Sequence, residues 1–180
     1  MTNPASLRPA RTADIPAMEA LIRRSGIELS KGFYTAQQAQ AVTRHVFGVD
    51  TQLVEDGTYF VVERDGLLLA CGGWSKRATL YGGDRHKRGP DPLLDPATQP
   101  ARIRAFFVDP SSPRQGLGRL LMEHCEREAK AAGFRTMELA ATLPGVPLYR
   151  ACGFAEVEPM SLALPDSVEV PLSRMRKQIG

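Results

Sequence analysis

The chain has 180 residues, of which 43% are hydrophobic and 24% charged, and its formal net charge is +3. This length predicts a single domain over residues 1–180 with one hydrophobic core. The small net charge does not support nucleic-acid binding, no apolar run is long enough to cross a bilayer, and we expect no signal peptide. Three scattered cysteines without a C-x-x-C pair predict neither a zinc site nor a disulfide framework, and they favour a cytoplasmic location.

Two helices are predicted within the first 50 residues. The first begins after Asp14, a candidate N-cap, has Pro16 in its first turn, and breaks at Gly26. The second begins after Thr35, which is also a candidate N-cap, and it ends near Gly48.

A β-hairpin follows these helices. Residues 58–63 and 67–74 are rich in β-branched and apolar side chains, and the Asp65-Gly66 step between them is typical of a tight hairpin turn. Gly72-Gly73 near the end of the second strand indicates a bulge or a close approach of another backbone.

Residues 75–100 are expected to form a long connection without regular structure. Five basic side chains and four prolines fall within it: Lys76, Arg77, Arg85, Lys87, Arg88, Pro90, Pro92, Pro96 and Pro100. We favour a solvated hairpin extension, because runs of charge usually face solvent. A cap over a substrate mouth and a site for an acidic partner are the alternatives.

The next segment contains a strand, a glycine loop, a helix and a second strand. Strand residues 101–108 lead to a helix that begins near Gly116 and ends at Gly133, and residues 136–142 form the returning strand. A helical crossover of this length implies that the two strands are parallel. Two strand-like runs, 154–157 and 168–175, end the chain. The predicted fold is therefore α+β, a mostly antiparallel mixed sheet of about six to seven strands flanked by helices.

The glycine loop is a candidate anion site. A strand, a loop and a helix start aim unpaired backbone N–H groups at an anion, and Gly116 and Gly118 would let that backbone approach a phosphate closely. The dinucleotide pattern G-x-G-x-x-G fails because Leu121 takes the third glycine position. The P-loop pattern fails because no lysine follows at the required spacing.

This stretch resembles the pyrophosphate loop of the GNAT superfamily of N-acetyltransferases, V-x-P-x-x-[RQ]-x-x-G-x-[GA]. Four residues fit in register: Val108, Pro110, Gly116 and Gly118. Pro113 stands where the family usually has Arg or Gln, and Arg114 beside it is the candidate replacement. Downstream, Leu148 to Phe154 resembles the family's closing motif, L-Y-x-x-x-G-F, with Thr142 and Gly145 in place of the usual Asn and Ala.

The resemblance covers nearly the whole chain and implies a GNAT-like acyl-CoA N-acyltransferase fold and an enzyme. It implies direct transfer of an acetyl group from acetyl-CoA to a primary amine of a small molecule or peptide, with Tyr149 as general acid and without a metal. A homodimer is the expected assembly, if any. The predicted cofactor contacts are Phe106, Phe107, Val108, Arg114, Gln115, Gly116, Leu117, Gly118 and Arg119.

Two questions stay open at this level. A general base is not identified: Glu138 alternates onto one face of its strand, where it could meet a cleft, a helix surface or solvent, and water-mediated deprotonation is equally compatible. Direct transfer needs no nucleophilic cysteine, so Cys125 and Cys152 are given no catalytic role. The alternative function is a catalytically idle acyl-CoA-binding or sensing module on the same fold.

Overall fold

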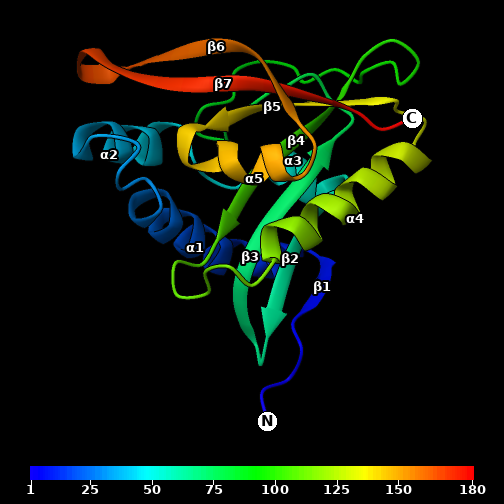
Figure 1. The fold of residues 1–180 in the computed structure, drawn as a ribbon, viewed down its shortest axis with the longest axis horizontal. Helices are drawn as coiled ribbons and strands as arrows, with labels where there is room; N and C mark the ends of the chain where they lie inside the picture. Colours follow the sequence, from blue (N-terminus) through cyan, green and yellow to red (C-terminus); the bar gives the residue numbers. More distant parts are fainter.

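The computed structural model describes all residues from 1 to 180. Seven strands form one sheet in the order β1-β2-β3-β4-β5-β7-β6, and all neighbours are antiparallel except the β4–β5 pair (Figure 1). This confirms the predicted mixed sheet. The strands are β1 (Ser6–Pro9), β2 (Tyr59–Arg64), β3 (Leu67–Ser75), β4 (Ala101–Val108), β5 (Thr136–Thr142), β6 (Ala155–Leu164) and β7 (Val168–Gln178).

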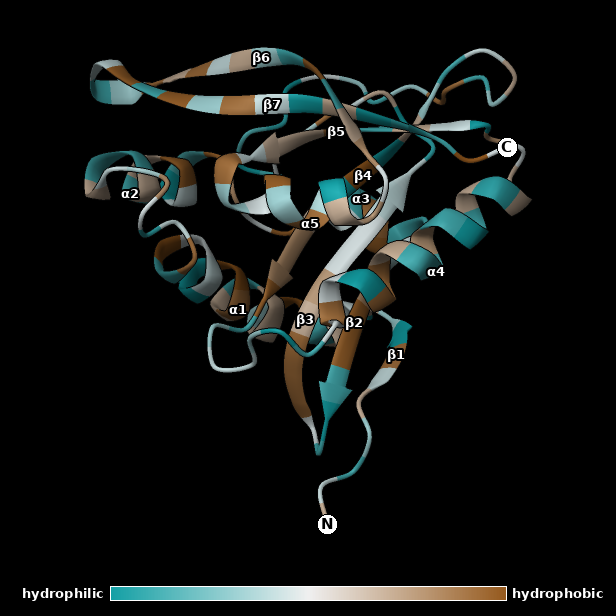
Figure 2. Cartoon of the chain, in the orientation of Figure 1, coloured by the Kyte–Doolittle hydropathy of each residue, from teal (hydrophilic) through white to brown (hydrophobic).

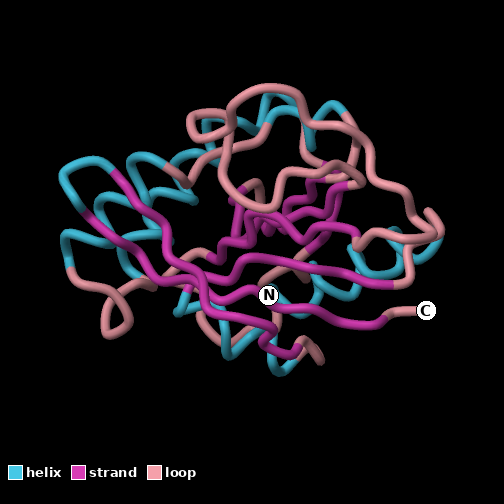
Figure 3. Tube along the Cα trace, turned by 90° about the horizontal axis from the view of Figure 1, so that it is seen from above, coloured by secondary structure: helices cyan, strands magenta, loops and turns pink.

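Five α-helices flank the sheet. They are α1 (Ile15–Glu28), α2 (Ala36–His45), α3 (Thr51–Glu55), α4 (Leu117–Ala131) and α5 (Val146–Ala151). In Figure 1, α1 and α2 lie on the left and α4 on the right, and Figure 3 shows the strands from above with helices around them. Side chains of α1 and α3 pack on one face of the central strands, α2 packs on the β6–β7 hairpin, and α4 and α5 cover the opposite face.

The alternation of strand side chains explains these two layers. In β2, Tyr59 and Val61 face α1, whereas Phe60 and Val62 face α4. Figure 2 shows β2 and much of β4 in brown and the first part of β3 as well, while the outer surface of α4 is largely teal. A strand that is apolar on both faces is typical of the middle of a sheet covered on both sides.

The first helix differs from the prediction at both ends. The Asp14 carboxylate does not cap α1, because it accepts hydrogen bonds from the Arg8 guanidinium at 2.7 Å and from the Arg11 N–H. The helix also continues through Gly26 to Glu28. A Cβ at Gly26 would lie 2.8 Å from both Phe47 and Thr43, so this glycine serves the close packing of α1 against the α2 region rather than a helix stop.

The other local predictions agree better with the structure. Thr35 caps α2 by accepting the Gln38 N–H at 3.1 Å, and the β2–β3 hairpin turns at Asp65-Gly66. Residues 76–100 contain no helix or strand, as expected. The short elements β1 and α3 were not predicted, and β6 and β7 extend beyond the predicted runs.

Candidate functional site

The two parallel strands of the sheet separate soon after they begin. β4 and β5 pair only at Ala101 with Met137 and at Arg102 with Glu138. Beyond this point a pocket occupies the space between them, and the β5-facing edge of β4 has no strand partner. The pocket is lined by Val42, Val46, Phe47, Gly48, Leu80, Tyr81, Gly82, Gly83, Ile103, Ala105, Phe106, Phe107, Leu139, Ala140, Thr142, Tyr149, Leu162 and Leu172.

A bulge in β4 shapes one wall of this pocket. Ala105 has a left-handed backbone with φ of 52°, and the pairing of β3 with β4 shifts at the same place. The Tyr59 hydroxyl donates to the Ala105 carbonyl at 3.3 Å. On the β3 side a Cβ at Gly72 would lie 2.5 Å from the Phe106 ring, so only glycine leaves room for that ring. Of the two predicted alternatives, the close backbone approach is confirmed at Gly73, where a Cβ would lie 2.5 Å from the Thr58 carbonyl oxygen, whereas the extra residue of the bulge belongs to β4.

The predicted cofactor contacts on β4 lie on opposite sides of the sheet. Phe106 packs with the α4 and α5 layer, whereas Phe107 packs against Phe47, at 5.0 Å between ring centroids, in the α1 layer. Both line the pocket. Val108 does not line it and pairs with Ala70 of β3.

The loop after β4 presents a run of free backbone donors. The N–H groups of residues 114–119 donate to no acceptor within the protein. Arg114 and Gly116 both have left-handed backbones, with φ of 56° and 73°, which bends these donors into a concave nest of the kind that binds phosphate. The N-terminus of α4 adds its partial positive charge. Pro113, the residue that departs from the family pattern, is exposed and precedes residues 114–119. Its missing N–H therefore removes none of these six donors.

The two glycines of the loop have different roles. Gly116 faces open space, with no atom within 4 Å of the position that a Cβ would take, so it leaves the nest accessible to an anion. Gly118 is buried, and a Cβ there would lie 2.7 Å from Leu148 of α5. Gly118 therefore allows α4 to pack closely on α5, and contact of its backbone with a phosphate stays a prediction.

Tyr149 lies on α5 at the edge of the pocket and is 9% exposed. Its ring packs near Phe106 and Phe154, with centroid distances of 6.3 Å and 6.1 Å. A Cβ at Gly145 would lie 2.9 Å from the Tyr149 ring, so glycine at this position leaves room for the ring. Burial raises the pKa of the Tyr149 phenol, so the hydroxyl stays protonated well into the alkaline range.

The tyrosine hydroxyls separate into two groups. Tyr34 donates to the Pro171 carbonyl at 2.6 Å, and Tyr59 donates to the Ala105 carbonyl. The hydroxyls of Tyr81 and Tyr149 form no hydrogen bond within the protein, and both residues line the pocket. These two hydroxyls are therefore available to a bound molecule.

Glu138 is not available as a base. Its side chain is 4% exposed and forms ion pairs with Arg176 and, at 3.2 Å, with Arg102. The carboxylate therefore faces neither a cleft, nor a helix surface, nor solvent, because it lies in an arginine cluster on the sheet. The pocket itself contains no carboxylate or imidazole among its lining residues.

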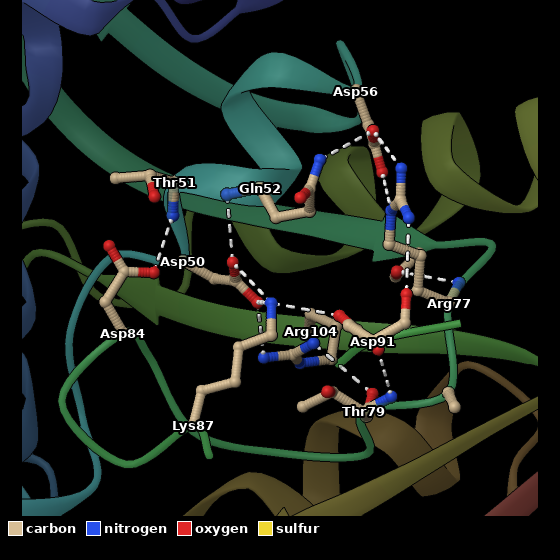
Figure 4. A network of polar contacts seen from close by, with 12 residues as sticks. Asp50, Thr51, Gln52, Asp56, Arg77, Thr79, Asp84, Lys87, Asp91 and Arg104 are labelled. Atoms are coloured by element: carbon tan, nitrogen blue, oxygen red, sulfur yellow. Dashed lines mark hydrogen bonds and ion pairs between the residues drawn. The ribbon is translucent and has the colours of Figure 1, made fainter. Parts of the chain in front are cut away.

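The 76–100 segment is more than a solvated extension. Residues 80–83 form part of the pocket wall, and a buried ion cluster ties the segment to the fold (Figure 4). Arg104 of β4 pairs with Asp50 at 3.1 Å, both side chains being 1% exposed, and it donates to the Thr79 and Gly82 carbonyls. Lys87 pairs with Asp50 at 3.0 Å. An arginine inside the apolar 101–108 run was the available sequence signal for this cluster.

No group of three or more His, Cys, Asp or Glu side chains is arranged to hold a metal ion. None of the helices has the length and apolar character required to span a membrane.

Comparisons with known proteins agree with this geometry. A curated relative, an IAA acetyltransferase from Azospirillum brasilense, is 24% identical over 140 residues, which cover 76% of this chain and 80% of the relative. An N-acetyltransferase from Staphylococcus aureus Mu50 has a TM-score of 0.65 at 18% identity and covers 99% of this chain and 100% of its own.

Two further solved structures were determined with the cofactor. A putative acetyltransferase from Salmonella typhimurium with acetyl-CoA has a TM-score of 0.65 at 16% identity and covers 99% of this chain and 95% of its own. A phosphinothricin acetyltransferase from Sinorhizobium meliloti in complex with AcCoA has a TM-score of 0.64 at 18% identity, and the match covers 98% of this chain and 89% of that protein. These likenesses establish the fold. The model of the acetyltransferase (GNAT) family matches residues 24–154, well over half of the sequence, and the chain therefore belongs to the acetyltransferase (GNAT) family.

Proposed function

We propose that this enzyme transfers the acetyl group of acetyl-CoA directly to a primary amine in the pocket between β4 and β5, with Tyr149 as the general acid. The observation that carries the proposal is the free Tyr149 hydroxyl at that pocket. Tyr149 lies on α5, which packs through Leu148 against Gly118 in the loop with the free N–H groups of residues 114–119. Acetyl-CoA supplies a thioester acyl group and a pyrophosphate for the nest. The solved relatives that contain acetyl-CoA support this choice.

The residues present can carry each part of the transfer. The amine nitrogen forms a bond to the acetyl carbon as the carbon–sulfur bond breaks, and the Tyr149 phenol gives its proton to the departing thiolate. The nitrogen releases its proton to water, and water returns a proton to the Tyr149 phenolate. The apolar walls favour the neutral amine over the ammonium, which is the nucleophilic form. No side-chain base is needed, in agreement with the absence of a carboxylate or imidazole from the lining residues.

The direct test is to incubate the protein with acetyl-CoA and a mixed panel of amines while measuring the release of free thiol. We expect thiol release that depends on the amine, with the N-acetylated amine identified by mass spectrometry. Thiol release at the same rate with and without amines, or none with any amine, would contradict the proposal.

The pH dependence of kcat should report the raised pKa of Tyr149. The protonated phenol is the active form, so a raised pKa moves its loss to a more alkaline pH than the ordinary value of about 10. We expect kcat to rise as the amine loses its proton and to show no falling limb up to about pH 10. A falling limb with a midpoint below about pH 10, in protein that stays folded by circular dichroism, would contradict this assignment.

The nest is tested by placing a negative charge inside it. Gly116→Asp should weaken CoA binding by at least about 30-fold in calorimetry, equivalent to about 2 kcal/mol, because the carboxylate would oppose the pyrophosphate. Asp tolerates the left-handed backbone better than most residues, so the fold should persist.

Gly57→Asp is the matched control. Gly57 has the same φ of 73° and the same open surroundings as Gly116, and it lies at the end of α3. The control also places an Asp in a left-handed backbone, remains folded, and should keep full CoA affinity. Equal affinities for both variants would show that the loop does not hold the pyrophosphate.

A further inference from the structure

The pocket between β4 and β5 has two different sides. Phe106, Leu139 and Tyr149 belong to the α4 and α5 layer, close to the proposed cofactor loop. The opposite side is formed by α2, the 76–100 segment and the β6–β7 hairpin. Its walls come from Val42, Val46, Phe47, Leu80, Tyr81, Leu162 and Leu172. An acceptor that meets the acetyl group from the side opposite the cofactor would rest against these walls.

These walls contain no charged side chain. The charged groups that reach the lining residues are already paired with each other. Arg104, which donates to the Gly82 carbonyl, is neutralised by Asp50. Glu19, close to Gly48, pairs with Arg85 at 2.8 Å. No carboxylate is therefore free to receive a second positive charge on an acceptor.

Backbone hydrogen bonds hold the 76–100 wall in place. The Gly83 N–H donates to the Val46 carbonyl at 2.9 Å, and the Asp84 N–H donates to the Val49 carbonyl at 3.1 Å. Tyr81 packs against His86 at a ring-centroid distance of 5.3 Å. On the other side of Leu80, the Thr79 carbonyl accepts a hydrogen bond from Arg104 at 3.3 Å. Because the chain is held before and after Leu80 and Tyr81, these residues are part of a preformed surface.

From this lining we propose that the acceptor is a monoamine whose amino group is carried on an uncharged alkyl or aryl group, and that Leu80 and Tyr81 of the 76–100 segment select it. This proposal rests on the proposed acetyl transfer. An apolar group is stabilised by burial against these walls, whereas an unpaired ammonium loses its hydration there and gains no counter-charge. Diamines, polyamines and other multiply charged amines should be poor acceptors.

Hexylamine and 1,6-diaminohexane form a matched pair, because they have the same chain and differ by one terminal ammonium. With saturating acetyl-CoA we expect kcat/KM to be at least about 100-fold higher for hexylamine. Leu80→Glu should reduce this preference at least about 10-fold by giving the second ammonium a partner. Leu93→Glu makes the same change in the same segment, at a side chain that is 63% exposed and outside the pocket, and it should leave the preference unchanged.

The outcomes separate this inference from the proposed function. Acetylation of both amines with equal kcat/KM, or a preference for the diamine, would overturn the acceptor class and leave acetyl transfer standing. If neither amine is acetylated, the binding of both amines is measured by calorimetry on the protein with bound CoA. Much tighter binding of hexylamine than of the diamine supports the inference. Equal binding of both, or no binding of either, overturns it. If no amine of any class increases the release of free thiol from acetyl-CoA, the proposed function itself is contradicted.

Discussion

Replacing Tyr149 with phenylalanine is expected to lower kcat by about 10²–10⁴-fold while the affinity for CoA stays nearly unchanged. The substitution keeps the ring that packs near Phe106 and Phe154 and removes only the hydroxyl. Since that hydroxyl has no hydrogen-bond partner within the protein, its loss should leave no buried group unsatisfied and should cost little stability. The measurement is kcat on a confirmed amine substrate, with CoA affinity determined by calorimetry.

Tyr81→Phe is the matched control for this variant. Tyr81 is the second pocket tyrosine with a free hydroxyl, and it lies on the acceptor side. Its substitution should change KM for the amine more than kcat. A large fall in kcat for Tyr81→Phe with normal kcat for Tyr149→Phe would transfer the acid role to Tyr81. A fall in CoA affinity for Tyr149→Phe would make that residue a cofactor contact.

The second large effect is expected at the buried ion cluster of Figure 4. Asp50→Asn should lower the free energy of unfolding by about 3–5 kcal/mol, because Arg104 would remain buried without its counter-charge. Asparagine is also a good N-cap, so the hydrogen bond from the Gln52 N–H that starts α3 can persist. The loss should therefore report the charge and not the cap. Chemical denaturation monitored by fluorescence provides the measurement.

Lys31→Met provides the control for a pair at the surface. Lys31 and Glu28 lie 2.8 Å apart with side chains 70% and 49% exposed, and removing that pair should change stability by less than about 1 kcal/mol. In folded Asp50→Asn protein, KM for the amine should rise while CoA affinity stays normal, because the cluster holds the pocket wall of the 76–100 segment. A stability loss as small as that of Lys31→Met would show that the Thr79 and Gly82 carbonyls suffice for Arg104.

The elements with clear local signals were predictable from the sequence. The strands 101–108 and 136–142 were predicted with the bounds that β4 and β5 have, because turn-forming residues such as Asp109-Pro110 and Gly133 border apolar runs. The Thr35 cap and the Asp65-Gly66 turn likewise depend on residues within a few positions of each other. At these positions no distant contact opposes the local signal.

The features that depend on distant contacts were not predictable in this way. Arg104 and Asp50 are 54 residues apart, so their pairing has no local pattern. The bulge at Ala105 places an alanine in a left-handed backbone, a conformation that sequence patterns assign to glycine. Asp14 and Gly26 have the residue types of a cap and a helix break, and tertiary contacts with Arg8 and Phe47 override both signals.

The most direct test of the proposed site is a crystal structure of the protein with CoA and hexylamine bound together. We expect pyrophosphate oxygens about 3 Å from backbone nitrogens of residues 114–119, the CoA sulfur beside the Tyr149 hydroxyl, and the amine on the side of Leu80 and Tyr81. A CoA molecule bound along the outer groove of α4, at Arg119, Lys130 and Lys177, or a sulfur remote from Tyr149, would contradict the site.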